Sequence, residues 1–216
     1  MLRLTLLGLP RLQRGDDGEV QLAPHIAPVL ALVALRGRIE RAELAGLLYP
    51  EHDAASARRN LRQLLHRRHD LFDAVLEHHG ERMQLRADVV VDALAPADAD
   101  DAAAARLEPL LGSLRYDGMP QLQAWLDDER SRRLGAWLNA LAGRAGLHER
   151  EGRLDDALAL AERIVLELPA SEHAHRRLMR LHYLRDDRPA ALAAFDACER
   201  VLKDELGAKP GAETLA

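Results

Sequence analysis

A run of basic side chains without acidic partners lies at residues 54–69. The stretch holds no aspartate or glutamate, and its arginines are Arg58, Arg59, Arg62, Arg67 and Arg68. A guanidinium can donate two hydrogen bonds to the O6 and N7 atoms of guanine, and additional arginines can bind phosphate groups. The stretch therefore has the chemistry of a surface that binds nucleic acid.

The leucine spacing predicts that these arginines stand on one helix at residues 53–69. Asp53 is a candidate N-cap, and the apolar stripe includes Ala57, Leu61, Leu64 and Leu65. At about 100° per residue, polar side chains occupy the opposite side and its flanks. Asparagine and glutamine suit adenine, so this helix has the composition that the major groove requires. The candidate DNA-binding residues on it are Arg58, Arg59, Asn60, Arg62, Gln63, His66 and Arg67. The alternative is a solvated arginine-rich face with no ligand.

The flanking sequence predicts the elements that position this helix. Residues typical of strands come first, and apolar residues at helical spacing follow them. Gly80-Glu81 then separates two short extended runs. The expected elements are strands at 2–7 and 19–22 with a turn at 15–18, helices at 24–37, 40–48 and 53–69, and a hairpin of 74–79 and 82–86. A helix in third place, directly before a hairpin, favours the DNA-binding interpretation.

The hairpin adds one more candidate contact, Arg82. It would act as a wing that lies along a phosphate backbone. An ordinary sheet edge is the alternative, because Glu77 and Glu81 lie close by in the sequence.

Composition indicates a division into domains. Residues 93–105 are rich in alanine and aspartate and predict a linker between a domain at 1–92 and a second domain at 106–216. The 13 arginines of residues 1–92 balance 13 acidic side chains, whereas the remainder holds 17 basic and 22 acidic side chains. The negative charge of the chain therefore belongs to its second half.

The second half contains an internal repeat. A shift of 34 residues pairs Ala157 with Ala191, Leu158 with Leu192, Glu162 with Asp196, Leu168 with Leu202, Leu147 with Leu181 and His148 with His182. This period is typical of tetratricopeptide repeats, whose helix pairs bury their apolar faces by stacking and often bind proteins. The predicted fold class is mainly α with a small β part: a winged helix-turn-helix domain followed by an α-helical tetratricopeptide-like repeat domain.

The sequence contains no motif for metal binding, nucleotide hydrolysis or nucleophilic catalysis. The histidines lack the spacing of a metal site, Cys198 is the single cysteine, and no glycine-rich phosphate loop or nucleophile motif occurs. We therefore expect no catalytic residue, no metal and no cofactor. No apolar run approaches the ~18 residues of a membrane span, which predicts a cytoplasmic protein without membrane contact.

Two groups of residues resemble the SARP type of bacterial activator. In the first half they are Leu6-Leu7-Gly8, Leu47-Leu48-Tyr49-Pro50-Glu51, Ala57-Arg58-Arg59-Asn60-Leu61-Arg62-Gln63, Leu85 and Asp92, which resemble its winged-helix domain. In the second half they are Trp125, Glu129, Arg130, Leu134, Pro169, Glu172, Leu178, Met179, Ala191, Leu192, Phe195, Cys198, Leu202, Glu205-Leu206-Gly207, Pro210 and Thr214, which resemble its bacterial transcriptional activation domain.

This resemblance implies a sequence-specific transcription factor. Its partners would be double-stranded DNA, bound at tandem promoter sites as a homodimer, and RNA polymerase or a sigma factor. Two alternatives stay open: a protein-interaction scaffold with a degenerate winged-helix domain, and the N-terminal fragment of a larger signalling regulator that contains an ATPase.

Overall fold

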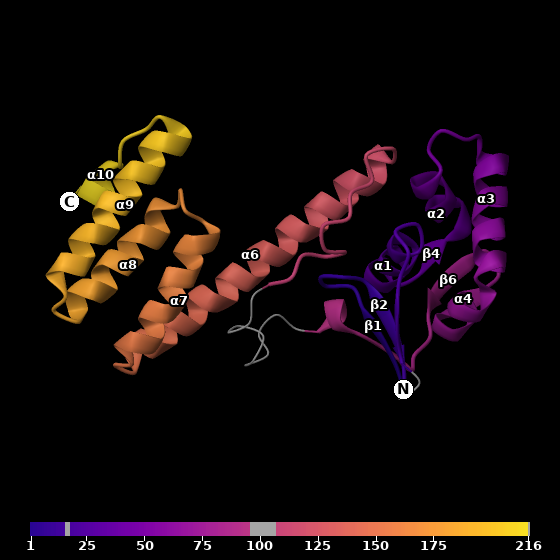
Figure 1. The fold of residues 1–216 in the computed structure, drawn as a ribbon, viewed down its shortest axis with the longest axis horizontal. Coiled ribbons are helices and arrows are strands. Elements are labelled where there is room, and N and C mark those ends of the chain that lie inside the picture. The colour runs from indigo at the N-terminus through magenta and orange to yellow at the C-terminus, as the bar shows by residue number, and fades with distance from the viewer. Residues whose placement is uncertain (16–17, 96–106, 216) are drawn as a thin grey trace. The chain divides into compact units, whose positions relative to one another are not determined.

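The computed structural model describes residues 1–15, 18–95 and 107–215. Its contacts divide the chain into two compact units, the first comprising Met1–Pro96 and Leu107–Arg133 and the second including Leu134–Ala216. In Figure 1 the first unit combines strands and helices, and the described part of the second is helical. Most of the linker predicted at residues 93–105, and the centre of the turn predicted at 15–18, lie outside the described residues.

The first unit contains short strands and an ordered succession of helices. Its strands are β1 (Leu2–Thr5), β2 (Arg11–Arg14), β3 (Glu19–Gln21), β4 (Ile39–Glu40), β5 (Leu76–His79), β6 (Arg82–Leu85) and β7 (Val89–Val91). Its helices are α1 (Ala27–Arg36), α2 (Arg41–Leu48), α3 (Ala54–Arg67), α4 (His69–Val75), the 3-10 turn η1 (Asp92–Leu94) and the first part of α6 (Pro120–Arg150). The three predicted helices and the hairpin follow in the expected order.

The N-terminal sheet has the strand order β3-β2-β1-β7. Strand β1 pairs antiparallel with β2 and parallel with β7, so that Leu4 faces Leu12 on one side and Val91 on the other. The side chain of Asp92 then accepts hydrogen bonds from the backbone amides of Leu6 at 2.8 Å and Leu7 at 3.1 Å. These bonds fix the end of β7 beside the strand that begins the chain.

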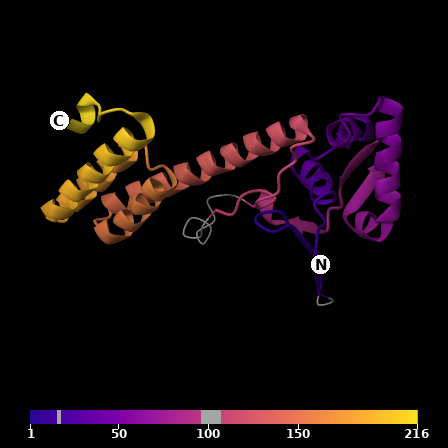
Figure 2. The same ribbon diagram turned by 45° about the horizontal axis from the view of Figure 1, so that its top comes forward.

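The second sheet, ordered β4-β6-β5, contacts helices α1, α2 and α4. Helix α1 is buried along Ala27–Ala34 because apolar side chains cover every face of it, and it ends at Gly37, where φ is 75°. Helices α2 and α3 pack against each other, and α3 lies at the outer edge of this unit in both Figures 1 and 2.

Helix α3 is shorter than predicted. The helical pattern breaks at Arg68, where φ is −125° and ψ is 32°, and α4 begins at His69. The break changes the direction of the chain, so that Leu71, Phe72 and Val75 of α4 enter the core from a new angle. The residues predicted to start the hairpin at 74 therefore end a helix.

Residues 107–133 pack into the core of the first unit. Leu110, Leu111, Leu122 and Leu126 are buried in the same cluster as β1 and α1. The Tyr116 hydroxyl donates to the Pro24 carbonyl at 2.9 Å. Because the sequence assigns residues 107–133 to the second domain, the predicted limits 1–92 and 106–216 do not coincide with the units that contacts define.

The second unit consists of paired helices. After the last part of α6 come α7 (Leu154–Glu167), α8 (Glu172–Leu184), α9 (Arg188–Leu206) and α10 (Ala212–Leu215). Helix α8 packs against both α7 and α9, and Figure 2 shows α8 and α9 side by side from a second direction. Among the described residues, no helix is long and apolar enough to cross a membrane.

The helix pairs follow the 34-residue period, but the paired positions differ in burial. Leu158 is 8% exposed, whereas its counterpart Leu192 is 66% exposed. Leu147 is 44% exposed, and its counterpart Leu181 is fully buried. The period therefore predicts the path of the backbone, and the position of each helix in the stack decides which leucines reach solvent.

Candidate nucleic-acid interface

Helix α3 begins at a well-formed N-cap. Asp53 Oδ1 accepts the backbone amides of Ala55 and Ser56, each at 2.9 Å, and Oδ2 accepts the Ser56 hydroxyl at 2.9 Å. The hydrogen bonds from Ser56, followed by that from Ala55, lower the pKa of the Asp53 carboxyl. The carboxylate therefore stays charged and satisfies amides that the first turn leaves unpaired.

The helix separates an apolar side from a basic side. Ala57 and Leu61 are buried, and Leu64 and Leu65 are half-buried against the core. The polar residues predicted on the opposite side are exposed, except Asn60, which is half-buried. The exposed ones are Arg58, Arg59, Arg62, Gln63, His66 and Arg67. The structure thus brings the seven helical candidates together on the solvent side of α3.

Arg59 lies close enough to Asp53 for its charge to help lower the pKa of that carboxyl, but the described α3 arginines form no direct ion pair. Among the described residues, Arg58, Arg59 and Arg62 make no ion pair with an acidic side chain. By contrast Arg36 pairs with Glu43 in the same unit. Guanidinium groups that are exposed and lack carboxylate partners can donate to an incoming ligand without first breaking an internal pair.

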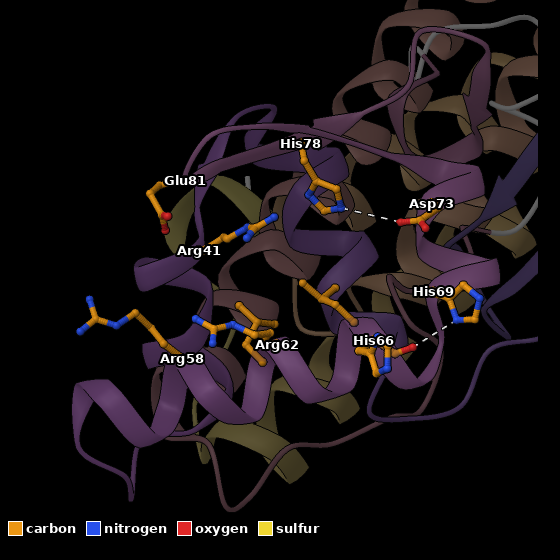
Figure 3. Close-up of a pocket in the computed structure, with 10 residues that line it drawn as sticks. Arg41, Arg58, Arg62, His66, His69, Asp73, His78 and Glu81 are labelled. Atoms are coloured by element: carbon orange, nitrogen blue, oxygen red, sulfur yellow. Dashed lines mark hydrogen bonds and ion pairs between the residues drawn. The ribbon is translucent and has the colours of Figure 1, made fainter.

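One flank of α3 borders a hollow of about 280 Å³, shown in Figure 3. Arg58 and Arg62 project from successive turns of α3, and Arg41 lies across from them on α2. The lining residues are Arg41, Arg58, Leu61, Arg62, Leu65, His66, His69, Asp73, His78 and Glu81. Three guanidinium groups around one hollow suit an anionic ligand such as a phosphate group.

One histidine of this hollow, His78, has a lowered pKa. His78 Nε2 lies 3.9 Å from Asp73 Oδ1, while burial, and then the nearby Arg41, lower the pKa of the His78 imidazole. His69 Nδ1 lies 3.2 Å from the His66 carbonyl oxygen at the end of α3. His78 is therefore neutral near neutral pH, whereas the three arginines of the hollow keep their positive charge.

The other flank of α3 borders a second hollow, of about 360 Å³. It is lined by His25, Tyr49, Asn60, Gln63, Leu64, Arg67 and Arg68. Arg59 borders neither hollow, as expected from its place between the two flanks at about 100° per residue. The α3 surface therefore has an arginine-rich flank, a flank with amide side chains and a ridge between them.

The hairpin residue Arg82 lies apart from both hollows. It is exposed on β6, and its Nη2 is 3.4 Å from Glu40 Oε1 across the β4–β6 pair. Glu81, not Arg82, borders the arginine-rich flank of α3. Of the eight candidate residues, Arg82 is thus the one that the fold does not gather onto the α3 surface.

Sequence reasoning missed residues that come to α3 from other elements. Arg41, the first residue of α2, lines the arginine-rich flank, while His25 lines the other. A helical wheel of α3 contains neither of these two residues. Only the packing of α2 on α3 brings Arg41 into place. In the part of the chain that the structure describes, no cluster of three potential ligands could hold a metal ion.

These features define a class of protein: a winged-helix unit with an exposed basic third helix, joined to a unit of paired helices. The match of residues 75–216 to the family model described as bacterial transcriptional activator domain shows that the chain belongs to that family. The resemblance to SARP-type activators is thereby confirmed, and the family is one of transcriptional regulators, not of enzymes.

A solved structure has the same fold. The chain is similar to Mycobacterium tuberculosis EmbR in complex with a low affinity phosphopeptide, with a TM-score of 0.63 and 22% sequence identity. The alignment covers 99% of this chain and 63% of that one, so this chain spans less than two thirds of the EmbR structure. A comparison with curated proteins gave no match. The predicted fold class, a winged helix followed by helical repeats, is confirmed.

Proposed function

We propose that this chain is a sequence-specific DNA-binding transcriptional regulator whose recognition helix is α3. The observation that supports this most is the set of exposed α3 arginines that form no ion pair with a carboxylate among the described residues. Membership of the bacterial transcriptional activator domain family supports regulation as the outcome.

The two flanks of α3 suggest a division of roles on DNA. Asn60 and Gln63 carry amides that suit adenine N6 and N7, while Arg59 on the ridge suits guanine O6 and N7. Arg58, Arg62 and Arg41 border the hollow that fits a phosphate group. Base recognition would then come from the ridge and the amide flank, and orientation on the duplex from the arginine-rich flank.

The activity beyond DNA binding is part of the same proposal. The chain would bind tandem promoter sites as a homodimer in the cytoplasm and activate transcription by contact with RNA polymerase or its sigma factor. The paired helices of the second unit would supply the protein contacts, because stacked repeats form extended binding surfaces.

The decisive experiment selects binding sites from a random duplex library and then measures isotherms on the selected site. The full chain should enrich a discrete sequence, and the Arg59→Ala variant should lose affinity for it. Arg115→Ala is the matched control, because Arg115 is an exposed arginine of the same unit that borders neither hollow. Failure to enrich any sequence would favour the protein-interaction scaffold instead.

A further inference from the structure

A further hollow of the first unit lies between the N-terminal sheet and the end of α3. Its volume is about 430 Å³, and residues of β2, β3, α3 and α4 line it together with Arg68, where the two helices meet. We call it the β2 hollow, and its lining residues are Leu12, Arg14, Val20, Arg67, Arg68, Asp70 and Leu71.

The β2 hollow adjoins the amide flank of α3. Arg67 and Arg68 line the β2 hollow and also the hollow that Asn60 and Gln63 border. Asn60 and Arg67 are seven residues apart, which places them on one side of the helix and about 10 Å apart along its axis. A ligand that follows the amide flank toward the C-terminal end of α3 therefore reaches the β2 hollow next.

Arg14 brings a positive charge from the sheet to this hollow. Leu12 and Arg14 are two residues apart on β2, so they project from the same face of the sheet, where Leu12 is buried and Arg14 is exposed. Arg14 Nη2 donates to the Asp70 carbonyl, in the first turn of α4, at 2.8 Å. This bond positions the guanidinium, which has five N–H donors and so retains donors for a ligand.

Positive charge exceeds negative charge in the described lining of the β2 hollow. Three guanidinium groups meet one carboxylate, that of Asp70, and Asp70 Oδ1 lies 2.8 Å from His69 Nε2. Glu19 projects from the opposite face of the sheet, where its carboxylate lies 3.1 Å from Arg11 Nε. Within the part of the chain that the structure describes, no ion pair joins the three arginines of the lining to a carboxylate.

We propose that the β2 hollow binds a backbone phosphate of the DNA, adjacent to the segment that α3 contacts, so that the interface extends from α3 to the N-terminal sheet. This inference rests on the proposed binding of DNA by α3. A phosphate group accepts charge-assisted hydrogen bonds from guanidinium groups, and such contacts orient a protein on the duplex without reading the base sequence. Arg14 and Arg68 therefore raise the affinity for every duplex and fix the sheet against the DNA backbone.

The test measures how salt affects binding of the full chain to the selected site within a duplex that has long flanks. Arg14→Ala and Arg68→Ala should each lower the affinity for selected and nonspecific duplexes equally and reduce the salt slope of binding by roughly 1. Arg14→Lys keeps the positive charge and should keep the slope. Arg3→Ala is the matched control and should also keep the slope, because Arg3 is an exposed arginine on the opposite face of the same sheet.

A second measurement locates the phosphate by shortening the duplex, one base pair at a time, from each end of the selected site. At one step the salt slope of the wild type should fall by roughly 1, while the slope of Arg14→Ala should not change at that step. Unchanged slopes in Arg14→Ala and Arg68→Ala, the same step in Arg14→Ala as in the wild type, or equal losses in Arg14→Lys and Arg14→Ala would each overturn the inference and leave α3 as the recognition helix. Failure of the wild type to bind any duplex would overturn both this inference and the proposed function.

Discussion

Asp53 and Ser56 are joined by two hydrogen bonds at the start of α3. The Ser56 backbone amide donates to Asp53 Oδ1, and the Ser56 hydroxyl donates to Oδ2, both at 2.9 Å. The pair closes the first turn directly before Arg58 and Arg59. The cap therefore links the stability of the helix to the placement of the residues that we propose to contact DNA.

Asp53→Ala should lower the melting temperature of the protein and weaken DNA binding, because the first turn of α3 loses its acceptor. Since the folded state lowers the pKa of Asp53, its contribution is present above the usual aspartate pKa of about 4 and disappears as the pH falls through the lower folded-state value. The melting-temperature difference between wild type and variant should therefore be larger at about pH 7 than at about pH 3.

Asp117→Ala is the control for this measurement, since Asp117 is an exposed aspartate that caps no helix among the described residues. Circular dichroism melts of wild type and both variants, recorded across the pH range, measure how the melting-temperature difference depends on pH. A difference for Asp53→Ala that does not shrink in acid would show that the charged cap is not its source.

Arg59→Ala and Arg62→Ala should each weaken specific DNA binding by about 1–3 kcal/mol and leave the fold intact. Both side chains are exposed opposite Ala57 and Leu61, and alanine favours helix. Gel-shift titration on the selected site measures the loss, and circular dichroism checks the fold. Wild-type affinity of the double variant would remove α3 from the role of recognition helix.

The exposed side of helix α3 itself could be predicted from the sequence because the information for it is local. The helix spans 14 residues, long enough for its leucines to define a buried side and thereby an exposed one. The hairpin is recognisable for the same reason, because Gly80 separates two short extended runs in the sequence. In the structure Gly80 has a φ of 62°, which glycine adopts readily.

Features that depend on distant pairing were not predictable. Strand β4 has two residues and pairs with β6, from Ile39 to Met83, so no alternation could reveal it. Leu110 bridges to Leu7, and Leu111 donates its amide to the Leu6 carbonyl. Nothing in residues 107–133 indicates that these leucines complete a core built about a hundred residues earlier, because an apolar residue fits the core of either unit.

Arg82→Ala should lower affinity for all DNA sequences equally and reduce the salt slope of binding by roughly 1, as the loss of one phosphate contact requires. Glu40→Gln is the matched variant, because it removes the carboxylate that lies 3.4 Å from the Arg82 guanidinium. It should strengthen binding slightly if Arg82 turns toward phosphate. Titration of each variant with a nonspecific DNA duplex over a range of salt concentrations gives the salt slope of binding for both variants. A change at a single base position would mean that Arg82 contacts a base edge.

Tyr116→Phe should destabilise the first unit by about 0.5–1.5 kcal/mol, because the Pro24 carbonyl loses its donor. Burial raises the pKa of Tyr116 to about 12, so the hydroxyl remains a neutral donor throughout the physiological range. Urea unfolding of the full chain measures the effect. Tyr183→Phe serves as the control, since Tyr183 is 64% exposed, and should leave stability unchanged. Equal stability of Tyr116→Phe and wild type would mean that this hydrogen bond contributes nothing.

A fragment of residues 1–133 should fold, bind a single half-site through α3 and fail to stimulate transcription. It keeps Leu110, Leu122 and Leu126, whose removal from a fragment of residues 1–95 would expose the core that they cover. The shorter fragment should therefore melt at a lower temperature. Because the missing second unit has more acidic than basic side chains, its loss should not weaken half-site binding.

The second unit should instead matter for cooperativity and for contact with the polymerase, as expected of stacked helix pairs. In vitro transcription with purified bacterial RNA polymerase, beside isotherms on a half-site and on a tandem site, separates the two roles. The fragment of residues 1–133 should bind the tandem site with less cooperativity than the full chain and give only basal transcripts. Undiminished transcription by this fragment would place activation in the first unit and leave the paired helices with a structural or regulatory role.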